Sequence, residues 1–498
     1  MGIFLQKNQA KRLFRSRLFI TVILFLLQLL LLTAVGDFLP GFVLRILSIL
    51  TILWILSRDD DPSYKISWTL LILLIPLPGC LFYLLFGNKR FGFNMKEQLE
   101  SYMSVQNFSA SRRSVTLTYS PISSYLQQQG VALHQNCSAE YFPCGEELFQ
   151  KLLDDLTSAK RFIFLEYFII SEGQLWNSIL HILEEKAQQG IDIRILYDDA
   201  GCLSTLPSGT AEELRQKGIH CAVFNPIHPR LNTFLNYRDH RKLCIIDAEI
   251  AYTGGANLSD EYVNLIQKHG HWKDCGIRIQ GKAVENFTSL FLQLWQFTTG
   301  EPVALSQCLS AKSSFKCPGF VQPFGSDPML PNSSAKNVLL HCFNRAESRL
   351  WIMTPYLIPD SETLCSLRRS ALSGVDVRII LPHIPDKWYV HSVAHSFYRP
   401  LLESGVRIFE YTPGFIHSKV VLSDNTALVG SINLDYRSLY LQFESAVALY
   451  DHPVIHSIQD DFLNTQSVSE EIDGKKMQHE PMILRFLRSL LRYFAPLM

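Results

Sequence analysis

Two copies of one short pattern stand out in the chain, because each combines residue types that can attack and neutralise a phosphate. The pattern is histidine, any residue, lysine, four residues and aspartate, and its members are His240, Lys242 and Asp247, then His417, Lys419 and Asp424. On an extended strand, residues two apart share a face, so we expect each imidazole beside its own ammonium. Two histidines and two lysines facing each other supply a nucleophile, a proton donor and charge neutralisation, which metal-free attack on a phosphodiester requires.

The repetition extends beyond these two patterns. A small residue and an amide follow each copy at matching offsets, in 254–258 (GGANL) and 430–434 (GSINL). Further upstream, other pairs of segments resemble one another, namely 161–170 with 348–359 and 190–194 with 374–378. Each half therefore contains an apolar strand, a helix, an apolar strand, a strand that starts with Gly-Ile or Gly-Val, and the strand with the pattern. This alternation is expected of an α/β layered sheet.

With these residues the chain resembles the phospholipase D superfamily and, within it, the bacterial cardiolipin synthases. The resemblance spans nearly the whole chain, and its most specific segments are 165–169 (LEYFI), 197–201 (YDDAG), 272–274 (WKD), 354–357 (TPYL) and 433–438 (NLDYRS). It implies two tandem phospholipase D-like halves, with mixed sheets flanked by helices and a pseudo-twofold relation, preceded by N-terminal membrane helices. We accordingly divide the chain into a membrane region (1–90), a linker (91–140), a first half (141–325), a second half (326–480) and an amphipathic C-terminal helix (481–498).

The composition of the chain bears on which class of phosphodiester such a site would bind. The 498 residues include 46 basic and 46 acidic side chains, so the formal net charge is zero. A nuclease usually has a basic excess that neutralises the phosphates along a strand, so this balance argues against nucleic acid as a partner. The 11 cysteines form no Cys-x-x-Cys pair, and several lie in apolar runs, which favours small core residues over a disulfide framework or a metal cluster.

Three apolar stretches near the N-terminus predict contact with a membrane. Stretches 18–35 and 38–56 are near the length that spans hydrocarbon, and we interpret the first as an uncleaved anchor because no clear cleavage site follows it. The third, 66–86, contains Pro76-Leu-Pro78-Gly79, which either kinks a span or turns a re-entrant hairpin. Basic residues before the first stretch and after the third both prefer the inside. This favours the hairpin, a multi-pass protein of the cell membrane and a cytoplasmic catalytic region.

The last segment has the pattern of a basic amphipathic helix. Arg485, Arg488 and Arg492 fall on one helical face, and apolar residues fall largely on another. Such a helix suits an anionic bilayer surface. A helix packed on the core with its arginines in water fits the pattern equally well.

The two histidines suggest a division of labour. One of His240 and His417 is expected to attack phosphorus and form a phosphohistidine, while the other donates a proton to the departing alkoxide. Two coupled imidazoles then have one neutral and one charged ring in the resting state. The residues alone do not say which histidine has which role.

Apolar neighbours flank both lysines, so a solvated charged face fits them poorly. Lys242 and Lys419 are expected instead to neutralise the non-bridging oxygens of the phosphate. Asn257 and Asn433 would donate to the same oxygens as negative charge develops. Ser431 stands where the first copy has a glycine, and it either adds a hydroxyl donor or is merely small.

The acidic residues have less direct roles. Asp247 and Asp424 are catalytic candidates as members of the pattern, yet a carboxylate at the end of a strand more often accepts backbone donors and holds the turn. The resemblance implies that Asp274 and Glu444 each orient the imidazole of the opposite half. It also implies that the first-half histidine, His240, is the nucleophile.

Two other polar positions lie near these segments. Glu166 ends an apolar strand, where it either orients a glycerol hydroxyl or caps the edge of a sheet, and the family pattern favours the first role. Gln442 stands where relatives commonly have asparagine, so we assign it no role.

His391 and His395 are four residues apart on a predicted helix, a spacing that can hold a metal ion. No glutamate or further cysteine joins them in sequence. We therefore interpret them as surface or core histidines and expect neither a metal nor a cofactor.

The resemblance implies a concrete reaction, in which two phosphatidylglycerols give cardiolipin and glycerol. At a bilayer, lipid alcohols are locally concentrated and compete with water for the intermediate. The alternatives are a membrane-bound phospholipase D or another phosphatidyltransferase, for example with phosphatidylethanolamine as donor, and an inert membrane scaffold, against which the intact patterns argue. The expected partners are phospholipids and the lipid bilayer, with no nucleic acid, and a homo-oligomer is left open.

Overall fold

The computed structural model describes residues 41–87, 119–227, 236–303, 305–309, 315–329, 334–474 and 481–497. The first half contains a seven-stranded mixed sheet. In order across the sheet, its strands are β2 (Ser138–Phe142), β10 (Gly276–Gln280), β8 (Ile250–Gly254), β7 (Lys242–Ile246), β3 (Phe162–Tyr167), β4 (Asp192–Asp198) and β5 (His220–Phe224). The β3–β4 and β4–β5 pairs are parallel, and the other pairs are antiparallel.

The second half repeats this sheet strand for strand. Its order is β11 (Phe320–Ser326), β20 (Gln442–Tyr450), β18 (Thr426–Gly430), β17 (Val420–Ser423), β12 (Arg349–Met353), β14 (Asp376–Pro382) and β15 (Arg407–Tyr411). The two parallel pairs, β12–β14 and β14–β15, again lie at the same end. Short strands extend it, namely β1 (His134–Gln135) and β21 (Ser469–Glu471) at the edges and β6 (Arg238–Asp239) beside β20. The predicted α/β class and internal repeat are confirmed.

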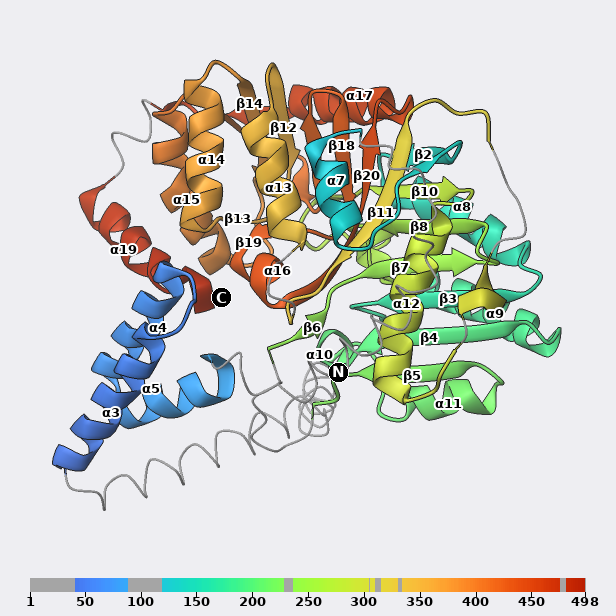
Figure 1. Ribbon diagram of the computed structural model, residues 1–498, viewed down its shortest axis with the longest axis horizontal. Helices are drawn as coiled ribbons and strands as arrows, with labels where there is room; N and C mark the ends of the chain where they lie inside the picture. Colours follow the sequence, from blue (N-terminus) through green and yellow to red (C-terminus); the bar gives the residue numbers. More distant parts are fainter. Residues whose placement is uncertain are drawn as a thin grey trace, which may run out of the picture.

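Helices cover both faces of each sheet, and the halves lie side by side (Figure 1). The outer face of the first sheet carries α8 (Gly145–Thr157), α9 (Gln174–Gln188) and α11 (Thr210–Gln216), and the outer face of the second carries α13 (Ser334–Arg345), α14 (Ser361–Leu372) and α15 (Trp388–Leu402). Between the halves lie α12 (Val284–Thr299) and α17 (Val454–Ser467). These two helices pack with residues of both sheets in one apolar cluster, which holds the halves in a fixed relation.

Shorter elements connect these layers. They are α7 (Pro121–Gln128), α10 (Asp199–Cys202), α16 (Tyr436–Tyr440), the strands β13 (Leu357–Ile358) and β19 (Leu434–Asp435), and the 3-10 helices η2 (Asp260–Val263), η3 (Leu305–Cys308) and η4 (Ala495–Leu497).

Three helices precede the halves: α3 (Gly41–Leu56), α4 (Pro62–Leu74) and α5 (Pro76–Phe82), which leads into a π-helical turn, η1 (Tyr83–Gly87). The predicted break is present at Ile75, since a proline disfavours helical backbone in the residue before it. A Cβ at Gly79 would lie 2.7 Å from the Cα of Ile72, so only a glycine allows α5 to pack this closely on α4. The stacking of Tyr64 on Tyr436, with ring centroids 5.6 Å apart, joins α4 to the second half.

The described residues include only part of the predicted membrane stretches. Stretch 18–35 lies outside the described residues, and most of stretch 38–56 forms the 16-residue α3. In the described ranges, no helix is both long enough and apolar enough to cross a membrane. The transmembrane spans therefore stay a prediction.

The C-terminal helix α19 (Met482–Arg492) packs on α15 in an orientation that neither sequence alternative described. The guanidinium carbon of Arg492 lies 4.2 Å from the ring centroid of Phe397 on α15, so the arginine face contacts the protein. The apolar face points away from it, and Phe486, for example, is 64% exposed. The arginines therefore do not simply lie in water, because the helix directs its arginine face toward the protein and its apolar face outward.

Candidate active site

Two short strands cross between the halves and bring the motif histidines to the opposite sheet. β6 pairs in parallel with the start of β20, and β16 (Gly414–Ile416) pairs in parallel with β9 (His271–Lys273). The residue that follows each crossing strand is a motif histidine. Backbone N–H groups continue the pairing, since His240 donates to the carbonyl of Phe443 at 2.9 Å and His417 donates to that of Lys273 at 2.6 Å. This register places each histidine next to a carboxylate of the other half.

The imidazole–carboxylate contacts have the same arrangement in both directions. His417 Nδ1 lies 2.7 Å from Asp274 Oδ2, and His240 Nδ1 lies 3.0 Å from both oxygens of Glu444. A carboxylate accepts hydrogen bonds, which places the proton of each ring on Nδ1 and leaves the Nε2 lone pair able to attack or to take up a proton. All four side chains are buried.

The two lysines are also symmetric. Each ammonium donates to the backbone carbonyl of its own motif histidine, so Lys242 stays beside His240 and Lys419 beside His417. Burial lowers the pKa of Lys242 to about 7 and the pKa of Lys419 to about 8. The positive charge of Lys419 lowers the pKa of Lys242 further.

Burial and these lysines also act on the histidines. They lower the pKa of His240 well below its ordinary value and the pKa of His417 to about 4. These shifts favour neutral rings near pH 7. The expectation of one neutral and one charged ring stays a prediction for a site that holds a phosphate, whose negative charge would stabilise a protonated ring.

Glu444 lies in a cradle of hydroxyl groups. Ser431 donates to one carboxylate oxygen, and Ser438 donates to the other at 2.7 Å. Burial raises the pKa of Glu444 to about 8, while Lys242 and the two hydroxyls act in the opposite direction. Ser431 is thus a hydroxyl donor, and its acceptor is the carboxylate of Glu444.

The equivalent position in the first half has no room for a side chain. A Cβ at Gly255 would lie 2.2 Å from Asp274 Oδ1 and 2.8 Å from the carbonyl oxygen of His417. The glycine therefore lets the backbone approach the carboxylate of Asp274 directly. In the second half, the serine hydroxyl occupies the corresponding place.

The two asparagines are buried in different surroundings. The Asn257 amide donates to the hydroxyl of Tyr262 at 2.7 Å, and its oxygen accepts the backbone N–H of Ile169 at 3.1 Å. Asn433 Oδ1 has no hydrogen-bond partner among the described residues. Donation by either amide to a phosphate stays a prediction.

Asp247 and Asp424 lie in the turns that follow the motif strands. Each adopts left-handed backbone, with φ of 55° and 49°, a conformation that aspartate tolerates in turns. Each carboxylate accepts three consecutive backbone N–H groups, of residues 160–162 and of residues 347–349 respectively. Their hydrogen bonds hold the turn to a neighbouring strand and do not reach the histidines.

Glu166 is fully buried on β3, a central strand between β7 and β4. The alternative that it caps a sheet edge is therefore wrong. Arg241 Nη1 lies 3.5 Å from the carboxylate of Glu166. Burial raises the pKa of Glu166. Burial also raises the pKa of Asp239, and the negative charge of Glu166 raises it further. A role in orienting a glycerol hydroxyl stays a prediction.

Aromatic side chains that were not predicted from the sequence surround the histidines. Three rings lie 5.3–5.9 Å from the imidazole of His417, measured between centroids, and belong to Trp272, Tyr262 and Phe415. Phe168 lies 5.1 Å from His240. Trp272 and Phe168 stand inside the recognised segments, so a search for aromatic positions there could have found them.

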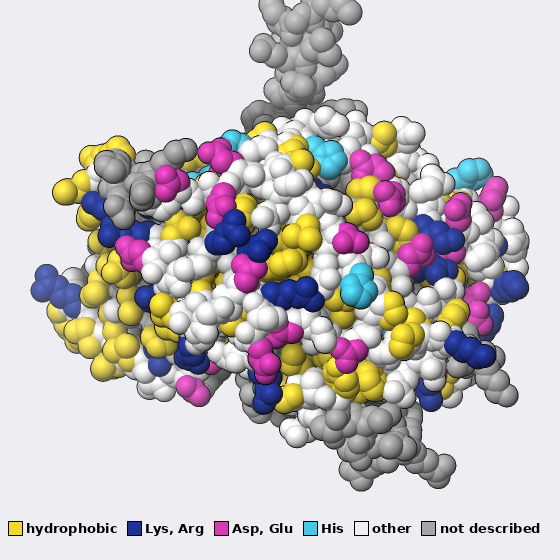
Figure 2. Space-filling model, turned by 90° about the horizontal axis from the view of Figure 1, so that it is seen from above, with side chains coloured by type: hydrophobic (Ala, Val, Ile, Leu, Met, Phe, Trp, Pro, Cys, Tyr) yellow, Lys and Arg dark blue, Asp and Glu magenta, His cyan; other side chains and the backbone are white. Residues whose placement is uncertain are grey.

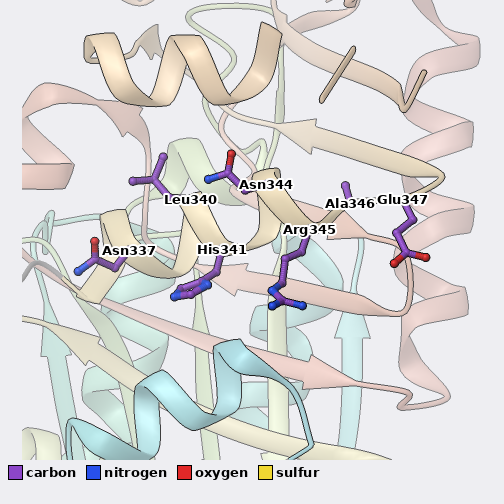
Figure 3. A pocket seen from close by; sticks show the side chains of 7 residues that line it. All are labelled: Asn337, Leu340, His341, Asn344, Arg345, Ala346 and Glu347. Carbon is purple, nitrogen blue, oxygen red and sulfur yellow. The ribbon is translucent and has the colours of Figure 1, made fainter. Parts of the chain in front are cut away.

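Hollows in the described part of the second half include one on α13 and one near the candidate site. One is lined by α13 and the turn that follows it (Figure 3), and none of its residues belongs to the site: Asn337, Leu340, His341, Asn344, Arg345, Ala346 and Glu347. A smaller one is adjacent to the site, because Phe415 lines it together with Tyr356, Lys387 and His391.

The chain is similar to known proteins over most of its length. Residues 152–295 and 339–465 match a family model described as "Cardiolipin synthase, PLD-like domain", and residues 46–88 match "Phospholipase_D-nuclease N-terminal". The cardiolipin synthase of Geobacillus thermodenitrificans is 32% identical over 491 residues, which cover 94% of this chain and 97% of that protein. Cardiolipin synthase 2 of Bacillus anthracis is 33% identical over 457 residues, covering 89% and 88%.

Two further comparisons concern a protein without a described activity and a solved structure. An uncharacterized protein of Streptococcus mutans is 37% identical over 461 residues, covering 90% of this chain and 99% of that protein. The crystal structure of a phosphatidylserine synthase from Haemophilus influenzae has a TM-score of 0.57 at 15% identity and covers 76% of this chain and 98% of that chain. At this identity, the likeness concerns the fold.

Proposed function

Because the chain belongs to the cardiolipin synthase family of phosphatidyltransferases with phospholipase D-like domains, we propose that it joins two phosphatidylglycerols into cardiolipin and releases glycerol. The observation that carries this proposal is the reciprocal pairing of each motif histidine with a carboxylate of the other half. In the proposed reaction, the two Nε2 atoms and the two ammoniums act on one phosphate. A transfer that passes through a covalent intermediate needs these groups.

In the first step, the Nε2 lone pair of His240 forms a bond to the phosphorus of one phosphatidylglycerol. The bond from phosphorus to the oxygen of the glycerol headgroup breaks, and His417 Nε2 gives its proton to that oxygen, so neutral glycerol leaves. The anionic phosphate supplies the negative charge that lets His417 hold this proton. Lys242 and Lys419 neutralise the non-bridging oxygens.

In the second step, His417 Nε2 takes the proton from a glycerol hydroxyl of a second phosphatidylglycerol. The hydroxyl oxygen attacks phosphorus, the bond from phosphorus to His240 breaks, and cardiolipin is complete. His417 then holds a proton again for the next cycle, and atoms and charges balance over the two steps. Asp274 and Glu444 keep both rings in the Nδ1–H tautomer throughout.

The surroundings of the site favour an alcohol over water in the second step. Both histidines are less than a tenth exposed, and aromatic rings surround His417. A lipid headgroup that binds among these rings displaces water and holds its hydroxyl near the phosphorus.

The outer surface suggests how lipid reaches the site. The exposed apolar side chains of α3 and α19 include Phe42, Ile46, Ile49, Phe486 and Leu487. Figure 2 shows hydrophobic side chains gathered at the left end of the molecule, where Figure 1 places α3 and α19. We propose that this end of a membrane-bound protein faces the lipid bilayer, with the catalytic halves on the cytoplasmic side.

Product analysis tests the proposed reaction. The full-length protein is incubated in vesicles or mixed micelles that contain phosphatidylglycerol as the sole phospholipid. We expect cardiolipin and glycerol in equal amounts, and only a small residual amount of either from a His417→Ala variant. Phosphatidic acid without cardiolipin would contradict the proposal and indicate a phospholipase D. Release of ethanolamine after addition of phosphatidylethanolamine would show a second donor.

A further inference from the structure

A cluster of imidazole and carboxylate groups lies outside the candidate active site, where α15 packs on β15. His391 and His395 stand one helical turn apart on α15, and Glu410 lies on β15. One ligand atom from each of the three lies within 4.8 Å of the others. The histidine spacing is visible in the sequence, but only the fold brings the carboxylate to it.

The distances approach those of a metal site. His391 Nε2 lies 2.9 Å from His395 Nε2, which lies 3.1 Å from Glu410 Oε1. Zinc binds nitrogen and oxygen ligands at about 2.0–2.2 Å, so ligand atoms of a tetrahedral site are about 3.3 Å apart. An outward shift of a few tenths of an ångström would bring these two contacts to that spacing, and the ligand atoms of His391 and Glu410, which lie within 4.8 Å of each other, would have to reach it as well.

Hydrogen bonds alone satisfy these three atoms poorly. The contact between the two Nε2 atoms needs one proton, and so does the contact between His395 Nε2 and the carboxylate. A proton on His395 Nε2 must be shared between two acceptors, and a proton on His391 Nε2 leaves a lone pair of His395 facing the carboxylate. A cation that accepts a lone pair from all three atoms removes this conflict.

Two outer groups orient the carboxylate. Tyr398 donates its hydroxyl to Glu410 Oε1 at 3.1 Å, and His383 Nδ1 lies 3.0 Å from Oε2. Such outer partners are typical of metal sites, where they fix the ligand that they contact. The His395 side chain is 19% exposed, so an ion has a path from solvent.

We propose that His391, His395 and Glu410 bind a divalent transition-metal ion, with zinc the best match to two imidazoles and one carboxylate. The ion is structural and takes no part in the transfer steps. It ties α15 to β15, and α15 supports α19 and contributes His391 to the hollow that Phe415 also lines. The metal therefore stabilises one wall beside the catalytic histidines.

Metal content tests this proposal directly. Untagged full-length protein is stripped with a chelator, reloaded with Zn²⁺ or Co²⁺ and desalted. We expect about one ion per chain, visible absorption bands of four- or five-coordinate Co²⁺, and a Tm several degrees above that of the stripped protein. The His395→Ala and Glu410→Gln variants should each lose the ion, the bands and the metal-dependent rise in Tm.

A matched control is available on α9. His181 and Glu185 are also four residues apart, with Nε2 and Oε1 3.7 Å from each other, but no third ligand joins them among the described residues. The His181→Ala variant should keep the ion. If either variant fails to fold, the metal content and Tm of the wild-type protein still test the proposal. Reloaded wild-type protein that retains no stoichiometric metal, or whose Tm is the same with and without it, would overturn the proposal.

Discussion

Each motif histidine depends on a carboxylate that lies far from it in sequence. Asp274 and Glu444 lie within hydrogen-bond distance of Nδ1 of the two rings, an arrangement that leaves the two Nε2 atoms for chemistry. The carboxylates differ in length, and the residues behind them compensate for this. Gly255 admits the shorter acid, and Ser431 donates to the longer one.

The division of labour between the histidines predicts a different defect for each. With labelled phosphatidylglycerol, wild-type protein quenched in denaturant should carry an acid-labile adduct on His240. The His240→Gln variant should form none, whereas His417→Gln should slow turnover about 10²- to 10⁴-fold because it removes the general acid and base. Peptide mapping of the quenched protein locates the label. An adduct on His417 would reverse the assignment.

The lowered pKa values of the lysines predict a fall in activity at mildly alkaline pH. Below their pKa the ammoniums neutralise the phosphate oxygens, and this charge is lost as the pH rises through about 7 for Lys242 and about 8 for Lys419. A profile of kcat/KM should therefore decline from about pH 7 to 8, well below the ordinary lysine pKa. The decline of kcat should occur at a higher pH than the decline of kcat/KM, because bound phosphate stabilises the charged ammoniums. A flat profile up to pH 10 would contradict this.

The close approach at Gly255 predicts a large effect from a single methyl group. In Gly255→Ala, the new Cβ meets Asp274 Oδ1, displaces the carboxylate from His417 and should lower kcat by two orders of magnitude or more. The matched Ser431→Ala change leaves the Cβ in place and removes one hydrogen-bond donor to Glu444. It should therefore lower kcat less than Gly255→Ala does. Steady-state kinetics of both variants, with Tm as a check on folding, test this order.

At the scale of elements, the crossing strands determine the site. β6 and β16 each leave their own half and pair with a strand of the other, and the histidines follow within one residue. The N-terminal helices and α19 have a different role, because they present apolar side chains outward. A helix with its arginines on the protein and its apolar residues outside is unfavourable in water.

The outward apolar face of α19 predicts contact with lipid at named positions. A polarity-sensitive dye on Leu487→Cys should shift to shorter wavelength when the protein is reconstituted in anionic vesicles. Leu463→Cys is the matched control, because Leu463 on α17 is 43% exposed and Leu487 is 48% exposed. Both changes are made with Cys365→Ser, which removes an exposed thiol. Equal shifts at the two positions would argue against this membrane face.

At the scale of the molecule, the two halves form one site through a shared core. α12 and α17 pack with both sheets in a single apolar cluster, so the halves cannot separate without exposing it. Both imidazole–carboxylate pairs form within one chain.

A site contained in one chain predicts that two inactive variants do not complement each other. Mixed micelles that contain both His240→Ala and His417→Ala proteins should show only the residual turnover of each alone. Recovery of a substantial fraction of wild-type activity on mixing would show that copies exchange halves of the site. Wild-type protein mixed with either variant controls for inhibition by the inactive chain.

The sequence by itself determined the repeat, the α/β class and the four histidines and lysines of the motifs, because local spacing and strand periodicity are encoded in neighbouring residues. The role of Ser431, the glycine requirement at 255 and the burial of Glu166 on a central strand were decided only by tertiary structure. Each depends on contacts with residues on other strands or turns, which local spacing in the sequence does not encode. The same holds for Glu410, which completes the histidine pair of α15 only after β15 has joined the sheet.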